Sequence, residues 1–303
     1  MKIGYPCINT TIGCKSSRTF RLKSYSEKRL IETVENNLTC LGRILRFNRK
    51  HNILFFRITS DLIPFASHPV CKFDWQKSFG RKFKAIGDFV KKCGIRISMH
   101  PDQFTLINSP DKRVFENSVR ELIYHAQVLD LMKLDTSAKI QIHVGGTFRD
   151  RDRSMIRFVE RFEKLDMIVK RRLVIENDDR CYGLRDCVQI SAKTRIPVLF
   201  DVFHHEVNSS GETIQEAFGL FTKTWKEKDG LAMVDYSSQM AGHKIGKHAE
   251  AINLKHFREF LDKSKPYDFD IMLEIKDKQT SALKAIEIAS QDNRFLVAEK
   301  HAS

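Results

Sequence analysis

The 303-residue sequence lacks the signatures of several common protein classes. Its seven cysteines form an odd, scattered set without a CxxC pair, which argues against a disulfide framework or a zinc ribbon and predicts reduced thiols. No window approaches the roughly 18 uninterrupted apolar residues of a membrane span. The N-terminus shows neither an apolar signal region nor transit-peptide composition. We therefore expect a soluble, cytoplasmic protein without a membrane partner.

Two nucleotide-binding motifs are also missing. Neither GxGxxG nor GxxxxGK[ST] occurs, and such glycine-rich loops are typical of doubly wound α/β folds. No stretch rich in proline, glycine and serine divides the chain. A single domain over residues 1–303 is therefore the economical expectation.

Negative charge is comparatively scarce. The chain has 52 Lys and Arg against 38 Asp and Glu, a net charge of +14. A basic excess favours a polyanionic partner, because each neutralised phosphate releases counterions. Solubility explains such an excess equally well, so charge alone leaves the partner open.

Strand-like and helix-like segments alternate along the whole chain. The expected strands are 2–5, 53–58, 95–99, 139–143, 172–176, 197–201, 231–235 and 270–274. The helices that follow them are 27–47, 75–90, 112–132, 154–169, 184–193, 213–226, 253–263 and 279–290, with a capping box expected at Ser24-x-x-Glu27. The strands are near-continuous apolar runs, as in buried parallel sheets. Eight such units predict a single-domain α/β fold, a (β/α)8 TIM barrel, in preference to a doubly wound sheet.

Six consecutive strands end on or beside a side chain that can bind a metal. These side chains are His100, His143, Glu176, Asp201, Asp235 and Glu274. A single histidine or carboxylate at a strand end is more often structural, but recurrence over six strands favours a site. Because the strand ends of a parallel barrel open on one face, the six groups are expected to converge. Carboxylates mixed with imidazoles predict a divalent metal cluster for hydrolysis at the C-terminal face.

Further candidates surround this set. His204 follows Asp201 by three residues, which is close enough for the two to ligate neighbouring metals. Glu176 lies in the middle of the series, where a carboxylate could bridge two cations. His68 lies in the loop FASHP after the second strand, and its role as a ligand or a phosphate contact is open.

Nine ordered blocks of this sequence resemble the UV damage endonuclease family, relatives of the endonuclease IV type of AP endonuclease. The blocks are GYPCIN (4–9), IPFASHP (63–69), SMHPDQF (98–104), IHVGG (142–146), IENDD (175–179), DVFHH (201–205), DYSSQ (235–239), GKHAE (246–250) and MLEIK (272–276). The resemblance implies a barrel nuclease with about two to three divalent metals, most often Mn²⁺, with Zn²⁺, Co²⁺ and Mg²⁺ as further options. It implies incision of damaged double-stranded DNA immediately 5′ to UV photoproducts, and also at abasic sites, leaving a 3′-hydroxyl and a 5′-phosphate.

The resemblance also assigns residues. The implied metal ligands are His100, His143, Glu176, Asp201, His204, His248 and Glu274, and the strand-end pattern adds Asp235 as an eighth candidate. Glu176 and His68 are the catalytic candidates, whereas Tyr5, Asn9, Gln103 and Phe104 match positions that touch or wedge the damaged duplex. The chain departs from the family on its seventh strand, where Met233-Val-Asp235 stands in place of the Lys-x-His of some members.

Two other functions compete with a monomeric DNA-repair nuclease. A metal-dependent sugar isomerase or epimerase can share the barrel and the ligand set, but a small polar pocket does not call for a basic perimeter. A DNA-binding module with a structural metal would use a closed site of four ligands, often rich in cysteine. The larger, harder ligand set predicted here favours catalysis.

Overall fold

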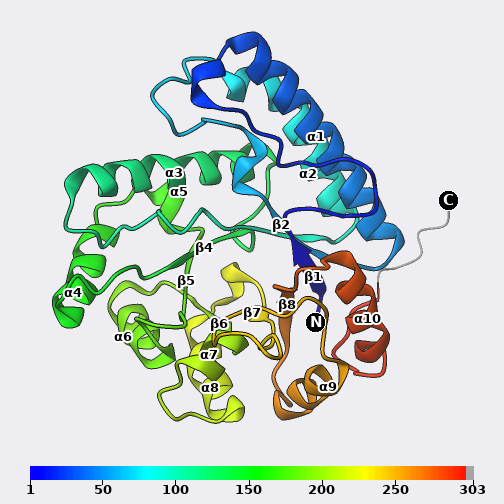
Figure 1. Ribbon diagram of the computed structural model, residues 1–303, viewed down its shortest axis with the longest axis vertical. Helices are drawn as coiled ribbons and strands as arrows, with labels where there is room; N and C mark the ends of the chain where they lie inside the picture. Colours follow the sequence, from blue (N-terminus) through cyan, green and yellow to red (C-terminus); the bar gives the residue numbers. More distant parts are fainter. Residues whose placement is uncertain (298–303) are drawn as a thin grey trace.

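Eight parallel strands pair in chain order and close into a barrel in the computed structural model, which describes residues 1–297 (Figure 1). The strands are β1 Ile3–Pro6, β2 Phe55–Ile58, β3 Arg96–Met99, β4 Lys139–His143, β5 Leu173–Glu176, β6 Val198–Asp201, β7 Ala232–Tyr236 and β8 Phe269–Leu273. The predicted (β/α)8 TIM barrel is confirmed. Residues 298–303 of the predicted domain lie outside the described residues.

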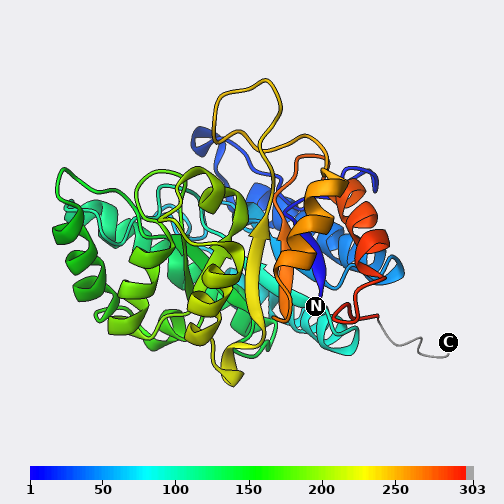
Figure 2. The ribbon, with the colours of Figure 1, turned by 90° about the horizontal axis from the view of Figure 1, so that it is seen from below.

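Helices surround the strands on the outside of the barrel (Figures 1 and 2). They are α1 Glu27–Lys50, α2 Trp75–Lys92, α3 Lys112–Leu131, α4 Arg151–Phe162, α5 Met167–Lys170, α6 Leu184–Thr194, α7 Val202–Val207, α8 Ile214–Phe221, α9 Leu254–Lys263 and α10 Gln279–Ala289. Their apolar faces pack on the strands. In α1, for example, Leu30, Val34, Leu38 and Leu41 follow the helical period and are all buried. Burial of each such side chain contributes about 1.5–3 kcal/mol.

Two predictions about helices need correction, and one helix was not predicted. The expected helix 154–169 is two helices, because a turn follows Phe162 and Asp166 caps the start of α5 by accepting from the Ile168 amide. The expected capping box at Ser24 is wrong, since Ser26 is the N-cap of α1 and accepts from the Arg29 amide. The short helix α7 was not expected, although Asp201 at the end of β6 is a typical N-cap residue.

The cysteine prediction is wrong at one pair. Cys14 and Cys40 form a disulfide with a Cα–Cα distance of 5.9 Å, while the other five cysteines are free. The long loop after β1 folds back against α1 and brings these residues within reach, a proximity that their spacing of 26 residues does not reveal. No helix among residues 1–297 is long and apolar enough to cross a membrane.

Paired charges fill the N-terminal end of the barrel, which we call the floor. Arg96 of β3 binds Asp270 of β8 at 2.9 Å, and Lys139 of β4 contacts Asp229 in the turn before β7. All four side chains are buried, so each charge depends on its partner for compensation. The opposite end, where the strands terminate, carries the candidate ligands, and we call it the mouth of the barrel.

Candidate metal centre

The C-terminal ends of β3 to β8 bring seven of the predicted ligands together. They form three overlapping groups: His100, His143 and Glu176; Glu176, Asp201 and His204; and Asp201, Asp235 and Glu274. Within each group, one ligand atom from every residue lies within 4.8 Å of the others. Glu176 is shared by the first two groups, and Asp201 by the last two. Metal binding by these residues stays a prediction, but their convergence is a property of the structure.

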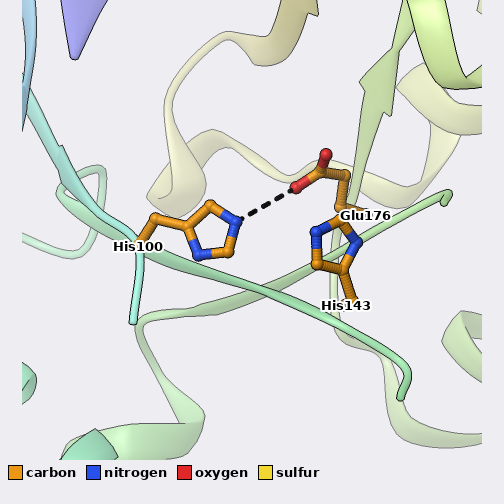
Figure 3. A group of neighbouring side chains, drawn as sticks. All are labelled: His100, His143 and Glu176. Carbon is orange, nitrogen blue, oxygen red and sulfur yellow. Dashed lines mark ion pairs between the residues drawn. The ribbon is translucent and has the colours of Figure 1, made fainter. Parts of the chain in front are cut away.

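The first group joins three neighbouring strands (Figure 3). His143 and Glu176 are register partners on β4 and β5, and His100 Nε2 points at Glu176 Oε2 from 3.7 Å. Burial lowers the pKa of His100 to about 4, so its imidazole is neutral at neutral pH and keeps a lone pair for a cation. The buried Nδ1 atoms of His100 and His143 have no hydrogen-bond partner among residues 1–297. A neutral imidazole with its Nε2 beside the Glu176 carboxylate fits a divalent metal.

The second group is organised by α7. Asp201 ends β6 and caps α7, so that the His204 amide donates to Asp201 Oδ1 at 2.6 Å. This cap turns the His204 ring back towards the mouth, where Nδ1 lies 3.3 Å from Glu176 Oε1 and 3.5 Å from Asp201 Oδ2. Burial acts to lower the pKa of His204, but the Asp201 and Glu176 carboxylates raise it to about 11. The two carboxylates therefore stabilise a positive charge at this position. A divalent metal would place a larger positive charge between them.

The third group contains a cation that sequence reasoning missed. Arg57 of β2 donates from Nη2 to both carboxylate oxygens of Asp235 at 2.7 Å, and its Nη1 contacts Glu274. Burial acts to lower the pKa of Arg57, but Asp235 and Glu274 raise it above its usual range, so the guanidinium stays charged. Burial likewise opposes ionisation of Glu274, yet Arg57 holds its pKa at about 2. The sequence did contain one sign of this buried cation, because Arg57 interrupts the otherwise apolar run 53–58.

Gln141 of β4 links the groups. Its Nε2 donates to Glu176 Oε2 at 2.8 Å and to Asp235 Oδ2 at 2.7 Å. The predicted ligand Asp235 therefore already accepts bonds from Arg57 and Gln141, and a metal at this carboxylate would compete with the guanidinium. Sequence reasoning missed Gln141 as well, although it lies two residues before His143 and so shares its inward face.

His248 lies at the edge of the cluster, outside the three groups. It follows the loop after β7, its Nδ1 lies 3.0 Å from the Glu274 carbonyl oxygen, and its ring is 5.9 Å from that of His204. Together with His100, His143 and Glu274 it lines a cavity of about 660 Å³. Gln103 and Phe104 line the same cavity, and the Phe104 side chain is 72% exposed. Both residues therefore have the access that a DNA contact requires.

Other predicted residues lie elsewhere. His68 is exposed, accepts from the Val70 amide at 3.0 Å, and lines a neighbouring cavity with Asp102 and Phe104. It belongs to none of the three groups found among residues 1–297, so its catalytic role stays a prediction.

Tyr5 and Asn9 lie deeper than the other predicted DNA contacts, and their contact with DNA stays a prediction. Tyr5 is fully buried and donates from its hydroxyl to Asn48 of α1 at 2.7 Å. Asn9 is 3% exposed and donates to the same Tyr5 hydroxyl at 2.9 Å. Side chains alternate along a strand, and Tyr5 points outward to the helices rather than into the mouth.

Comparisons with known proteins find relatives that match nearly the whole chain. The profile of the family described as UV-endonuclease UvdE matches residues 1–297. A UV DNA damage endonuclease of Clostridium perfringens is 41% identical over 98% of this chain and 72% of its own length. The crystal structure of SacUVDE is similar with a TM-score of 0.93 and 44% identity, covering 97% of this chain and 100% of that chain. The 3-keto-D-glucoside 4-epimerase YcjR of E. coli, covering 96% of this chain and 99% of that chain, is 11% identical with a TM-score of 0.56 and shares the fold alone.

Proposed function

This chain belongs to the UV-endonuclease family, and we propose that it is a metal-dependent enzyme that incises DNA immediately 5′ to UV photoproducts. As a member of that family it is a DNA repair endonuclease, which hydrolyses phosphodiester bonds. The proposed products are a 3′-hydroxyl and a 5′-phosphate, with abasic sites as further substrates. The observation that carries the proposal is the convergence of three ligand groups on Glu176 and Asp201 at the mouth of the barrel.

The residues that would hold metal are those at the ends of the six strands, with His204 and His248. When bound, about two to three divalent ions would acidify the attacking water and neutralise charge on the leaving oxygen. The hard carboxylates in the set favour Mn²⁺, with Zn²⁺, Co²⁺ and Mg²⁺ compatible with the same donors. Glu176, shared by two groups, would bridge two of the ions.

The surrounding residues hold these ligands in place. Gln141 fixes one oxygen of Glu176, and the Asn177 carbonyl oxygen, 3.0 Å from His204 Nδ1, helps to orient that ring. Such second contacts fix the tautomer and direction of a ligand ring. Arg57 remains charged and keeps Glu274 ionised.

Lesion recognition would use the exposed pair Gln103 and Phe104. Crosslinked pyrimidines stack poorly and distort the duplex, so moving them out of the stack costs less than moving intact bases. The exposed Phe104 ring would then fill the gap, and Gln103 would hydrogen-bond the bases left unpaired. Lys276 and Lys278, which line the same cavity, provide positive charge for the backbone.

The sugar isomerase or epimerase alternative is not favoured, because its support is a shared fold at 11% identity. We further propose that residues 1–303 act as one endonuclease domain, as a monomer on damaged duplex. The expected cytoplasmic location, at the nucleoid, stays a prediction.

One experiment tests the proposal. UV-irradiated and unirradiated duplexes of one sequence are incubated with the protein and Mn²⁺, with and without a chelator, and the cut position is read on a sequencing gel. We expect nicks immediately 5′ to photoproducts, in the irradiated duplex and without chelator only. Equal cutting of both duplexes, or full activity in the chelator, contradicts the proposal.

A further inference from the structure

The loop between β7 and α9 projects beyond the C-terminal ends of the strands (Figure 2, gold). It carries Ile245, whose side chain is 79% exposed, more than any other large hydrophobic residue described among 1–297. We call residues 239–248 the β7 tip. A single exposed isoleucine is common on protein surfaces, so the case for a partner depends on the charges beside Ile245 and on the position of the tip at the metal centre.

The β7 tip is a defined structure. Gln239 and His248 form an antiparallel bridge, and the Met240 amide donates to the Lys247 carbonyl oxygen at 2.8 Å. The Gln239 side chain lies inside the turn. Its Nε2 donates to the carbonyl oxygens of Met240 and Lys244, and its Oε1 accepts from the Gly246 amide, each at 3.0 Å. These bonds order the turn that carries the exposed Ile245.

The chemistry of the tip is apolar and basic together. Lys244 directly precedes Ile245, Lys247 follows two residues later, and residues 240–248 include no Asp or Glu. An aliphatic side chain flanked by lysines fits duplex DNA, since lysines neutralise phosphates while an apolar wedge enters a base step.

The tip also faces the proposed wedge across the mouth. β3 and β7 are four strands apart in a closed barrel of eight, so the loops that follow them rise on opposite sides. Phe104 follows β3 and His248 ends the β7 tip, and both line the cavity of the metal centre. Two exposed apolar residues, Phe104 and Ile245, therefore stand on opposite sides of the cavity that would receive the lesion.

We propose that Ile245 is a second wedge, which inserts into a base step of the damaged duplex on the far side of the lesion from Phe104. Lys244 and Lys247 bind the phosphates beside that step. This inference rests on the proposed function, because it presumes a damaged duplex as the ligand. Two wedges hold the damaged duplex on both flanks of the lesion and so contribute to its binding.

The test uses the metal-loaded protein and a duplex with one UV photoproduct. Nicking kinetics are measured for the wild type, for Ile245→Ser, and for the control Ile156→Ser, which changes another exposed isoleucine on the outer helix α4. For Ile245→Ser, KM should rise at least about 10-fold, as expected from the loss of one buried isoleucine, with kcat nearly unchanged. The control should behave as wild type.

Two further measurements locate the contact. With 2-aminopurine at the step on either side of the lesion, stopped-flow fluorescence before incision should show unstacking on both sides for wild type and on one side for Ile245→Ser. Changing Lys244 and Lys247 to alanine should reduce the slope of log affinity against log salt by about two, whereas Ile245→Ser should leave that slope unchanged.

The outcomes separate the inference from the function beneath it. If the wild type fails to nick the lesion duplex, the proposed function fails. If it nicks normally but Ile245→Ser matches it in KM and in both fluorescence signals, the second wedge is overturned and the tip serves another contact.

Discussion

The guanidinium of Arg57 donates from one nitrogen to both carboxylate oxygens of Asp235, each at 2.7 Å, inside the mouth of the barrel. β2 thus places a permanent cation among carboxylates that come from β7 and β8. Arg57 therefore supplies part of the positive charge that the carboxylate cluster requires. We expect the number of metal ions that the cluster binds to depend on the Arg57–Asp235 pair.

Arg57→Gln should increase the metal content by about one ion per chain, because Asp201, Asp235 and Glu274 lose their internal cation. The metal-free variant should also melt lower than wild type, since buried carboxylates are left uncompensated, and Mn²⁺ should restore part of the loss. Equilibrium dialysis with elemental analysis and thermal melts measure both effects. Arg153→Gln, which breaks an exposed pair with Glu160, is the control. Unchanged metal content would contradict the competition between Arg57 and a cation.

Glu176→Gln should abolish incision and spare binding. An amide is a poor bridge between cations, so we expect kcat to fall at least about 1,000-fold, roughly 4 kcal/mol, with affinity for damaged duplex within about 3-fold. Nicking assays and fluorescence anisotropy measure the two quantities. Glu206→Gln, at a surface carboxylate that pairs with His256, is the matched control. Near-normal cutting by Glu176→Gln would remove its bridging role.

Phe104→Ala should weaken discrimination between damaged and intact duplex. The ratio of the two affinities should fall by about 5-fold to 100-fold, the effect of losing one stacking ring at about 1–3 kcal/mol. Competition binding with both duplexes gives the ratio. Leu231→Ala, at an exposed leucine beside the floor, is the control. An unchanged ratio would contradict the assignment of Phe104 as a wedge.

Titration of Lys139, which lies in the floor, should make the free energy of unfolding depend on pH. Burial lowers its pKa from 10.5 to about 8, although Asp229 opposes the shift. Between these values the unfolded chain holds a proton that the folded protein has released, so the free energy of unfolding rises with pH across this window. At about 1.4 kcal/mol per unit the rise is on the order of 3 kcal/mol. Urea unfolding of wild type and Lys139→Met from pH 7.5 to about 10.5 should give diverging curves, and parallel curves would contradict the assignment.

The barrel could be predicted because eight apolar runs and eight amphipathic helices alternate, and each strand begins and ends within two residues of its expected bounds. The convergence of the ligands followed from that topology alone. Helix α7 was missed because Asp201 both ends strand β6 and caps the helix that begins at the next residue. No loop residues separate the two elements, so the sequence gives no sign that a new helix starts there.

Contacts made across the barrel were harder to foresee. Arg57 and Asp235 are 178 residues apart, and nothing local in either strand indicates the other. The Tyr5 hydroxyl donates to Asn48, 43 residues along the chain, and the short strand β1 does not indicate this partner. Local patterns predicted the elements, but side-chain partners required the closed barrel.

The paired charges of the floor have a consequence for how this protein can change. Arg96 pairs with Asp270, and Lys139 pairs with Asp229. The buried charges of the floor are therefore compensated within the floor and do not depend on charges at the metal centre. Substitutions at the two ends share no partner and should combine additively in their effect on stability. Selection can therefore remodel the loops around the cavity for new lesions while the opposite end of the same strands keeps the chain folded.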